Sequence, residues 1–111
     1  MPHCVIEYSS GLEKVIDMSQ LMIKLQFVIV ASQLFDPSAV KLRAIKYQDY
    51  MLAHDLQHFL HVSLKILSGR SQDKKILLSK QMLEVVRQLA PMTGVASTVE
   101  IHDMDPELYQ K

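Results

Sequence analysis

The sequence predicts an α+β fold in which duplicated β-α-β units form one four-stranded mixed sheet with both helices on one face. Two observations support this prediction. Apolar and polar residues alternate in four short stretches, and apolar residues recur at three- and four-residue steps in two longer ones. The order strand, helix, strand then occurs twice, over about residues 2–47 and 58–103. Right-handed crossovers would make the two strands of each unit parallel, so the two units can share a sheet.

Length and composition favour one domain over residues 1–111, because 49% of the chain is hydrophobic and can form a real core. The 12 basic and 12 acidic residues balance, so the chain has no net positive charge that would favour binding to nucleic acid or an anionic membrane. The longest apolar run, around residues 27–31, is far below the roughly 20 residues that cross a bilayer. A single cysteine, Cys4, and the lack of a secretory leader pattern favour the cytoplasm.

The first unit begins with a mostly apolar strand over residues 2–9. Asp17 and Gln20 then have the spacing of a capping box, which predicts the start of a helix. This helix is expected to run to about Leu34, because Pro37 pushes the residue before it out of the helical region. Its buried stripe is predicted from residues at helical spacing, which are Leu21, Met22, Leu25, Val28, Ile29 and Ser32.

Alternation returns over residues 40–47, which predicts a second strand with Lys41 and Arg43 on the same side. Residues 48–57 show no clear period and are interpreted as a connecting loop. The cleanest alternation of the chain covers residues 58–67 and predicts the third strand.

The second helix is framed by turn and capping residues. Gly69 allows a tight turn, Ser71 is well placed as the helix N-cap, and Pro91 ends the helix. Its buried face is predicted to consist of Ile76, Leu77, Met82, Leu83, Val86 and Leu89. Residues 97–103 alternate again as a last strand, and residues 105–111 are interpreted as a polar tail.

Two helices can cover only one face of a four-stranded sheet. The opposite face is then expected to expose apolar side chains, which soluble proteins normally bury against another subunit. The sequence therefore predicts an oligomer.

The beginning of the chain suggests chemistry, because Pro2 becomes the first residue once Met1 is removed. Its nitrogen is then a secondary amine, and burial beside cations would disfavour the protonated form. Such a neutral base can move protons on carbon next to a carbonyl. A proline at this position also occurs by chance in about one chain in twenty, so Pro2 alone is weak evidence.

A second candidate is Arg70, which is expected at the end of a strand and immediately before a helix. The free N–H groups of a helix start favour anions, so a carboxylate would bind well beside this arginine. The alternative is an ordinary surface arginine in a turn.

Other reactive side chains are better explained by structure. His54, His58 and His61 have no acidic or thiolate partner at ligand spacing along the sequence, so no metal site is predicted. Cys4 points to the same side of its strand as Pro2 and is interpreted as a core residue, not as a nucleophile.

Two short motifs in this duplicated pattern carry a family resemblance. Met1-Pro2-His3, with a strand ending Ile6-Glu7-Tyr8-Ser9, and the segment Leu64-Lys65-Ile66-Leu67-Ser68-Gly69-Arg70-Ser71 resemble the tautomerase superfamily. Within it, the chain is most similar to the 5-carboxymethyl-2-hydroxymuconate isomerase family, over nearly its whole length. The resemblance implies the tautomerase fold, a homotrimer, an amino-terminal proline as general base, and arginines that hold substrate carboxylates.

By position, Pro2 takes the role of the base and Arg70 that of the arginine after the glycine. Where relatives carry an arginine near the start of the second strand, this chain has Lys41, and the next cation on that face is Arg43. Lysine keeps the charge but lacks the bidentate fork of arginine. The tail is also short, so a pocket wall that relatives build from it is expected to be missing.

The function expected from these residues is isomerisation of an unsaturated keto or enol acid that bears carboxylates, without a cofactor. Pro2 would move the proton, and Arg70, Arg43 and Lys41 would bind the small-molecule carboxylate substrate. A trimeric protein of the same fold that binds a ligand or partner without turnover is the alternative.

Overall fold

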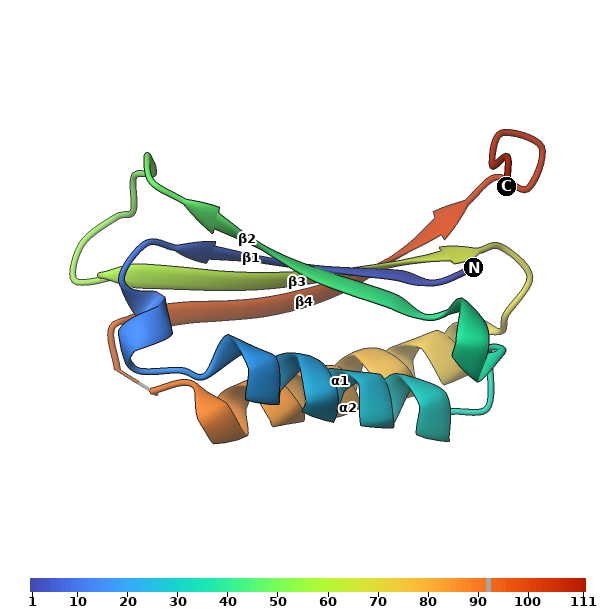
Figure 1. The fold of residues 1–111 in the computed structure, drawn as a ribbon, viewed down its shortest axis with the longest axis horizontal. Helices are drawn as coiled ribbons and strands as arrows, with labels where there is room; N and C mark the ends of the chain where they lie inside the picture. The colour runs from blue at the N-terminus through green and yellow to red at the C-terminus, as the bar shows by residue number, and fades with distance from the viewer. Residues whose placement is uncertain (92) are drawn as a thin grey trace.

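The computed structural model describes residues 1–91 and 93–111 and confirms the mixed sheet with two helices on one face (Figure 1). The strands are β1 (His3–Ser9), β2 (Lys41–Tyr47), β3 (His58–Leu67) and β4 (Val95–Met104), and the helices are α1 (Met18–Ala31) and α2 (Gln72–Leu89). Two 3₁₀-helices, Leu12–Lys14 and Pro37–Ala39, were not predicted. The strand order is β2-β1-β3-β4, with β1 parallel to β2, β3 parallel to β4, and β1 antiparallel to β3.

The central position of β1 fixes the surroundings of the amino terminus. His3 lies opposite Lys41 of β2 and opposite Lys65 of β3 in the two ladders. The first residues of β1 are therefore flanked by basic side chains from both neighbouring strands.

Helix α1 starts as predicted and ends earlier. The Asp17 carboxylate accepts hydrogen bonds from the backbone N–H groups of Ser19 and Gln20, at 3.0 and 3.2 Å, and so caps the first turn. The helix ends at Ala31 instead of continuing to Leu34, because Gln33 has a φ of 61° in the left-handed region. Neither helix in the described part of the chain is long and apolar enough to cross a membrane.

The buried face of α2 differs from the predicted one. Its fully or nearly buried residues are Leu78, Met82, Val85 and Val86, whereas Ile76 is 42% and Leu77 57% exposed. Each residue turns the helix by about 100°, so a stripe that passes through Leu78 leaves its neighbour Leu77 on the flank. The prediction therefore placed Ile76 and Leu77 in the core, whereas the first buried residue of α2 is Leu78.

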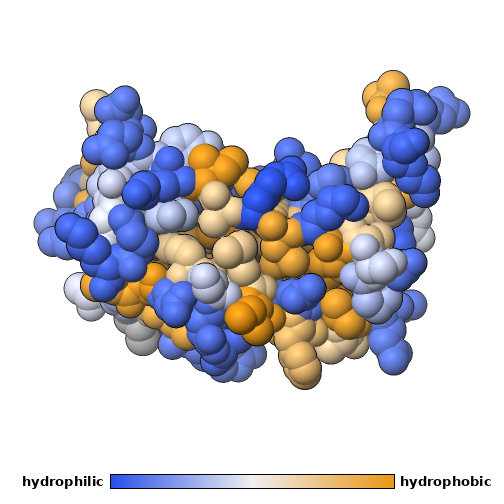
Figure 2. Space-filling view, viewed as in Figure 1, coloured by the Kyte–Doolittle hydropathy of each residue, from blue (hydrophilic) through white to orange (hydrophobic). Residues whose placement is uncertain are grey.

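The face of the sheet away from the helices is more polar than expected. One row across it consists of Arg43, Val5, Ser63 and Glu100 from the four strands, and only one of these is apolar. Large apolar side chains instead reach the surface in the helical layer (Figure 2), for example Phe27, which is 75% exposed. An apolar open face is thus not the feature that would drive association of subunits.

Candidate active site

The amino terminus lies at the start of β1, one of the two inner strands, among several positive charges. Pro2 is buried, and its carbonyl accepts a hydrogen bond of 3.1 Å from the backbone N–H of Lys41. The terminal amine of the chain belongs to Met1. Burial is the main cause that lowers the pKa of this amine, and the positive charges of Arg70, Lys111 and Lys41 lower it further. These cations come from the turn after β3, from the tail and from β2.

Arg70 is held firmly at the position where β3 leads into α2. Its Nη1 donates to the carbonyl of Leu67 at 3.0 Å, and its Nη2 donates to the carbonyl of Leu34 at 2.9 Å. Its guanidinium carbon lies 5.0 Å from the centre of the Phe35 ring. A guanidinium has five N–H groups, so Arg70 keeps further donors for an anion while its position is fixed by the protein.

The two cations of β2 have different neighbours. The Nζ of Lys41 donates to the carbonyl of Ala39 at 3.2 Å, and its charge reaches the terminal amine. The Nη1 of Arg43 instead donates to Nδ1 of His3 at 3.1 Å. The pKa of His3 is lowered by burial and then by the charges of Arg43 and Lys41, with smaller effects from the terminal amine and Lys65. Lys41 is therefore the β2 cation beside the amine, and Arg43 acts on the histidine.

The carboxyl-terminal tail is a part of this site that the sequence did not predict. Figure 1 shows both termini at the same end of the sheet. The carbonyl of Asp105 accepts hydrogen bonds from the N–H groups of Leu108 and Tyr109, which turns the tail. The hydroxyl of Tyr109 then lies 2.7 Å from Nε2 of His3, with the two rings edge to face. Tyr109 and Lys111 of the short tail therefore lie at this end of the sheet, close to His3 and the terminal amine.

A second polar cluster lies on β3 and β4. The Oε1 of Glu100 lies 2.7 Å from Nε2 of His102 and 3.1 Å from Nε2 of His61. These hydrogen bonds, that of His102 first, lower the pKa of Glu100 from its ordinary 4.5 to about 2. His61 therefore does have an acidic partner, which lies on the neighbouring strand and is not visible as sequence spacing. The described residues contain no group of three or more His, Cys, Asp or Glu side chains suited to hold a metal ion.

Cys4 is part of the core, as predicted. Its side chain is 0% exposed, and burial raises the pKa of its thiol to about 12. A thiol that stays protonated and inaccessible is a poor nucleophile.

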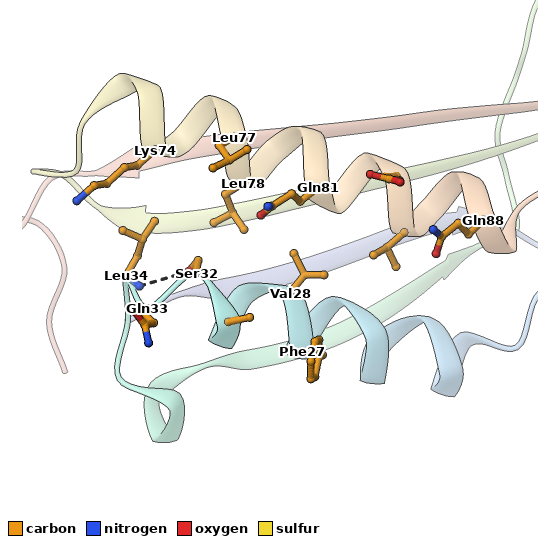
Figure 3. Close-up of a pocket in the computed structure, with 13 residues that line it drawn as sticks. Phe27, Val28, Ser32, Gln33, Leu34, Lys74, Leu77, Leu78, Gln81 and Gln88 are labelled. Carbon is orange, nitrogen blue, oxygen red and sulfur yellow. Dashed lines mark hydrogen bonds between the residues drawn. The ribbon is translucent and has the colours of Figure 1, made fainter.

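A wide groove lies elsewhere on the molecule. It has a volume of about 760 Å³ and lies between α1 and α2, where Phe27 and Leu77 line it with mostly apolar and amide neighbours (Figure 3). The only charged side chains in its lining are Lys74 and Glu84, and no residue of β1 contributes. The cations that act on the terminal amine lie at the end of β1 and not in this groove.

Comparisons with known proteins agree with this assignment of the fold. A family model described as 5-carboxymethyl-2-hydroxymuconate isomerase matches residues 2–111. The 5-carboxymethyl-2-hydroxymuconate Delta-isomerase of Escherichia coli is 25% identical over 115 residues, which cover 97% of this chain and 90% of the relative. The crystal structure of a 5-carboxymethyl-2-hydroxymuconate isomerase from Deinococcus radiodurans R1 superposes with a TM-score of 0.89 at 24% identity, covering 99% of this chain and 87% of that one.

More distant structures share the fold. A fused 4-OT protein described as a symmetric trimer has a TM-score of 0.72 at 18% identity, over 93% of this chain and 85% of its own. A macrophage migration inhibitory factor-like protein from Entamoeba histolytica has a TM-score of 0.74 at 14% identity, over 99% and 94% of the two chains.

Proposed function

This chain belongs to the 5-carboxymethyl-2-hydroxymuconate isomerase family of the tautomerase superfamily, and from this premise we propose its reaction and the residues that perform it. Membership supports an isomerase or tautomerase. We propose that the substrate is an unsaturated keto or enol acid with carboxylates, similar to 5-carboxymethyl-2-hydroxymuconate, and that Pro2 is the general base once Met1 has been removed. No cofactor is needed for this chemistry.

The observation that carries the proposal is the lowered pKa of the terminal amine at the end of β1. Burial and the charges of Arg70, Lys111 and Lys41 act on the amine of Met1, and they would act on the amine of Pro2 once that residue is the first. Both effects disfavour the protonated form, so a larger fraction of the amine is a neutral base near pH 7.

In the proposed mechanism, the neutral amine of Pro2 removes a proton from a carbon activated by the conjugated acid. The negative charge spreads over a dienolate, and the protonated amine returns the proton to another carbon of the same system. Arg70 and Lys41 would hold carboxylates and stabilise the dienolate, with Arg43 as a further cation on the same sheet face. The bonds that fix Arg70 to Leu67 and Leu34 support this role, because a preorganised charge needs little reorganisation during the reaction.

We propose a homotrimer as the working form. Support comes from the shared fold with fused 4-OT proteins that are described as symmetric trimers. Light scattering should give three times the chain mass of 12.7 kDa at micromolar concentration, and a stable monomer would contradict the proposal.

The deciding experiment uses purified protein whose amino terminus has been shown by mass spectrometry to be Pro2. Ultraviolet absorbance should show isomerisation of 5-carboxymethyl-2-hydroxymuconate, 2-hydroxymuconate or phenylenolpyruvate. The matched control is Pro2→Ala, which keeps a terminal amine but replaces the secondary amine of proline by a primary one. A folded Pro2-starting protein that binds these acids and turns over none would favour the alternative, a binding protein of the same fold.

A further inference from the structure

The tail residue Tyr109 has a defined place in the charged end of β1. We propose that its hydroxyl donates a hydrogen bond to the oxygen on which negative charge develops in the substrate, and that His3 and Arg43 are positioning residues for this donor. The inference rests on the proposed isomerase function and adds a catalytic residue to it.

The directions of the hydrogen bonds follow from the chemistry of the side chains. A guanidinium can only donate, so Nδ1 of His3 must accept the 3.1 Å bond from Arg43. His3 is then the neutral tautomer with its proton on Nε2, and it donates the 2.7 Å bond to the hydroxyl of Tyr109. The lowered pKa of His3 is consistent with this neutral form.

One proton is left over at the end of this chain of bonds. Because the oxygen of Tyr109 accepts from His3, its own O–H is available to a third group. Among residues 1–91 and 93–111, the structure places no acceptor for that proton, and His3 is the only side-chain partner of the hydroxyl. The three groups therefore all donate in one direction, from Arg43 through His3 to Tyr109 and outward.

The tail that carries Tyr109 lies at the same end of the sheet as the terminal amine (Figure 1). The charge of the terminal amine acts on His3, and that of Lys111, two residues after Tyr109, acts on the amine. Tyr109 is half-buried here, whereas its neighbour Leu108 is 81% exposed. The tail thus holds a neutral donor, backed by the cation of Arg43, at the end of β1 where we propose that the substrate binds.

A donor in this position suits the reaction. Negative charge builds up on an oxygen of the dienolate as the base removes the proton, and a fixed O–H donor stabilises it more than the starting acid. Loss of one such donor typically lowers kcat by about 10²–10³-fold. The competing explanation is that Tyr109 only holds the tail in place so that Lys111 stays beside the amine.

The test compares Pro2-starting protein with Tyr109→Phe, which removes the hydroxyl and keeps the ring. Lys111→Met serves as the tail-charge control and Leu108→Ala as the matched tail control. Donation to the substrate predicts a kcat about 100-fold lower in Tyr109→Phe, a KM within about threefold, and an unchanged acid limb of the pH profile. Lys111→Met should move the acid limb to higher pH, because one of the three cations beside the amine is gone while Arg70 and Lys41 remain.

A second variant keeps the test independent of how well Tyr109→Phe folds. His3→Phe keeps a ring against Tyr109 but removes the bond to its hydroxyl, and it should lower kcat by about tenfold. The double variant His3→Phe/Tyr109→Phe should be no slower than Tyr109→Phe alone, because the two residues act as one unit.

The outcomes separate the two proposals. An active wild type with an unchanged kcat in Tyr109→Phe overturns the donor role and leaves the isomerase function standing. A loss in Tyr109→Phe that comes with the same acid-limb shift as Lys111→Met, or that adds fully to the loss in His3→Phe, also overturns it in favour of tail anchoring. An inactive Pro2-starting wild type overturns the isomerase function and this inference together.

Discussion

The guanidinium carbon of Arg70 lies 5.0 Å from the centre of the Phe35 ring, so the residue after β3 is stacked on a residue after α1. The carbonyls of Leu67 and Leu34, which accept from the same guanidinium, come from these two segments as well. Arg70 is therefore tied to both β-α-β units at once. Because contacts from both units hold the guanidinium in place, another cationic side chain at this position would not take up the same position.

Arg70→Lys tests this point, because lysine keeps the positive charge but cannot make both carbonyl bonds or stack on the Phe35 ring. We expect kcat/KM for carboxylate substrates to fall by about 10–100-fold in Arg70→Lys and further in Arg70→Ala. Steady-state kinetics on the Pro2-starting protein measure this. Arg87→Ala, which removes an exposed arginine near the end of α2, is the control and should change little. Unchanged kinetics in a folded Arg70→Ala protein would remove Arg70 from the site.

The Glu100 cluster gives a prediction on stability against pH. The pKa of this carboxyl is lowered from 4.5 to about 2 in the folded protein by hydrogen bonds from His102 and His61. Because the pKa of Glu100 is lower in the folded protein than in the unfolded chain, its ionised carboxylate stabilises the folded state at pH values above the unfolded-chain pKa of about 4.5. This contribution is lost as the pH falls from about 4.5 towards 2. The difference in the free energy of unfolding between wild type and Glu100→Gln should therefore shrink over that range.

Urea unfolding at pH 6 and at pH 3 measures that difference. Glu107→Gln is the control, because its exposed carboxylate has no hydrogen-bond partner among the described residues. If Glu100→Gln and Glu107→Gln show the same pH dependence, the cluster makes no contribution of this kind.

Gly69, which directly precedes Arg70, gives a second prediction on stability. Its φ of 121° is a conformation that residues with a Cβ rarely adopt, although a Cβ built there meets nothing within 4 Å. Gly69→Ala should therefore lower the free energy of unfolding by about 1–3 kcal/mol through backbone strain and not through a clash. Denaturant unfolding measures it, with the exposed neighbour Ser68→Ala as control. Equal midpoints for the two variants would show that this turn relaxes without cost.

Strands and helix starts could be predicted because their signals are local. The alternation over residues 58–67 gives β3 with the observed bounds, and Ser71 caps α2 through its hydroxyl, which accepts from the N–H of Lys74. Two residues proposed for the site, Pro2 and Arg70, stand out for the same reason. Each lies at the end of a strand that the alternation defines.

The parts that could not be predicted depend on contacts between distant residues. His3 and Tyr109 are 106 residues apart, and only the folding of the tail over β1 brings them together. The pairing of His61 with Glu100 likewise depends on the register between β3 and β4. The rotation of α2 that exposes Leu77 is set by packing against the sheet, which a run of apolar residues does not define. A tyrosine in a polar tail was the one visible signal for Tyr109.

The last prediction concerns Met1, which carries the terminal amine in this structure. While Met1 is attached, the nitrogen of Pro2 is a tertiary amide whose lone pair is delocalised into the carbonyl, so it cannot accept a proton. Protein that retains Met1 should therefore be nearly inactive, although its amine has a lowered pKa, because that amine is one residue away from the position of Pro2. Mass spectrometry should separate two species in partly processed material, and isomerase activity should follow only the fraction that starts at Pro2. Treatment with a methionine aminopeptidase should convert inactive protein into active protein in the same proportion. Full activity from homogeneous Met1-containing protein would refute Pro2 as the base.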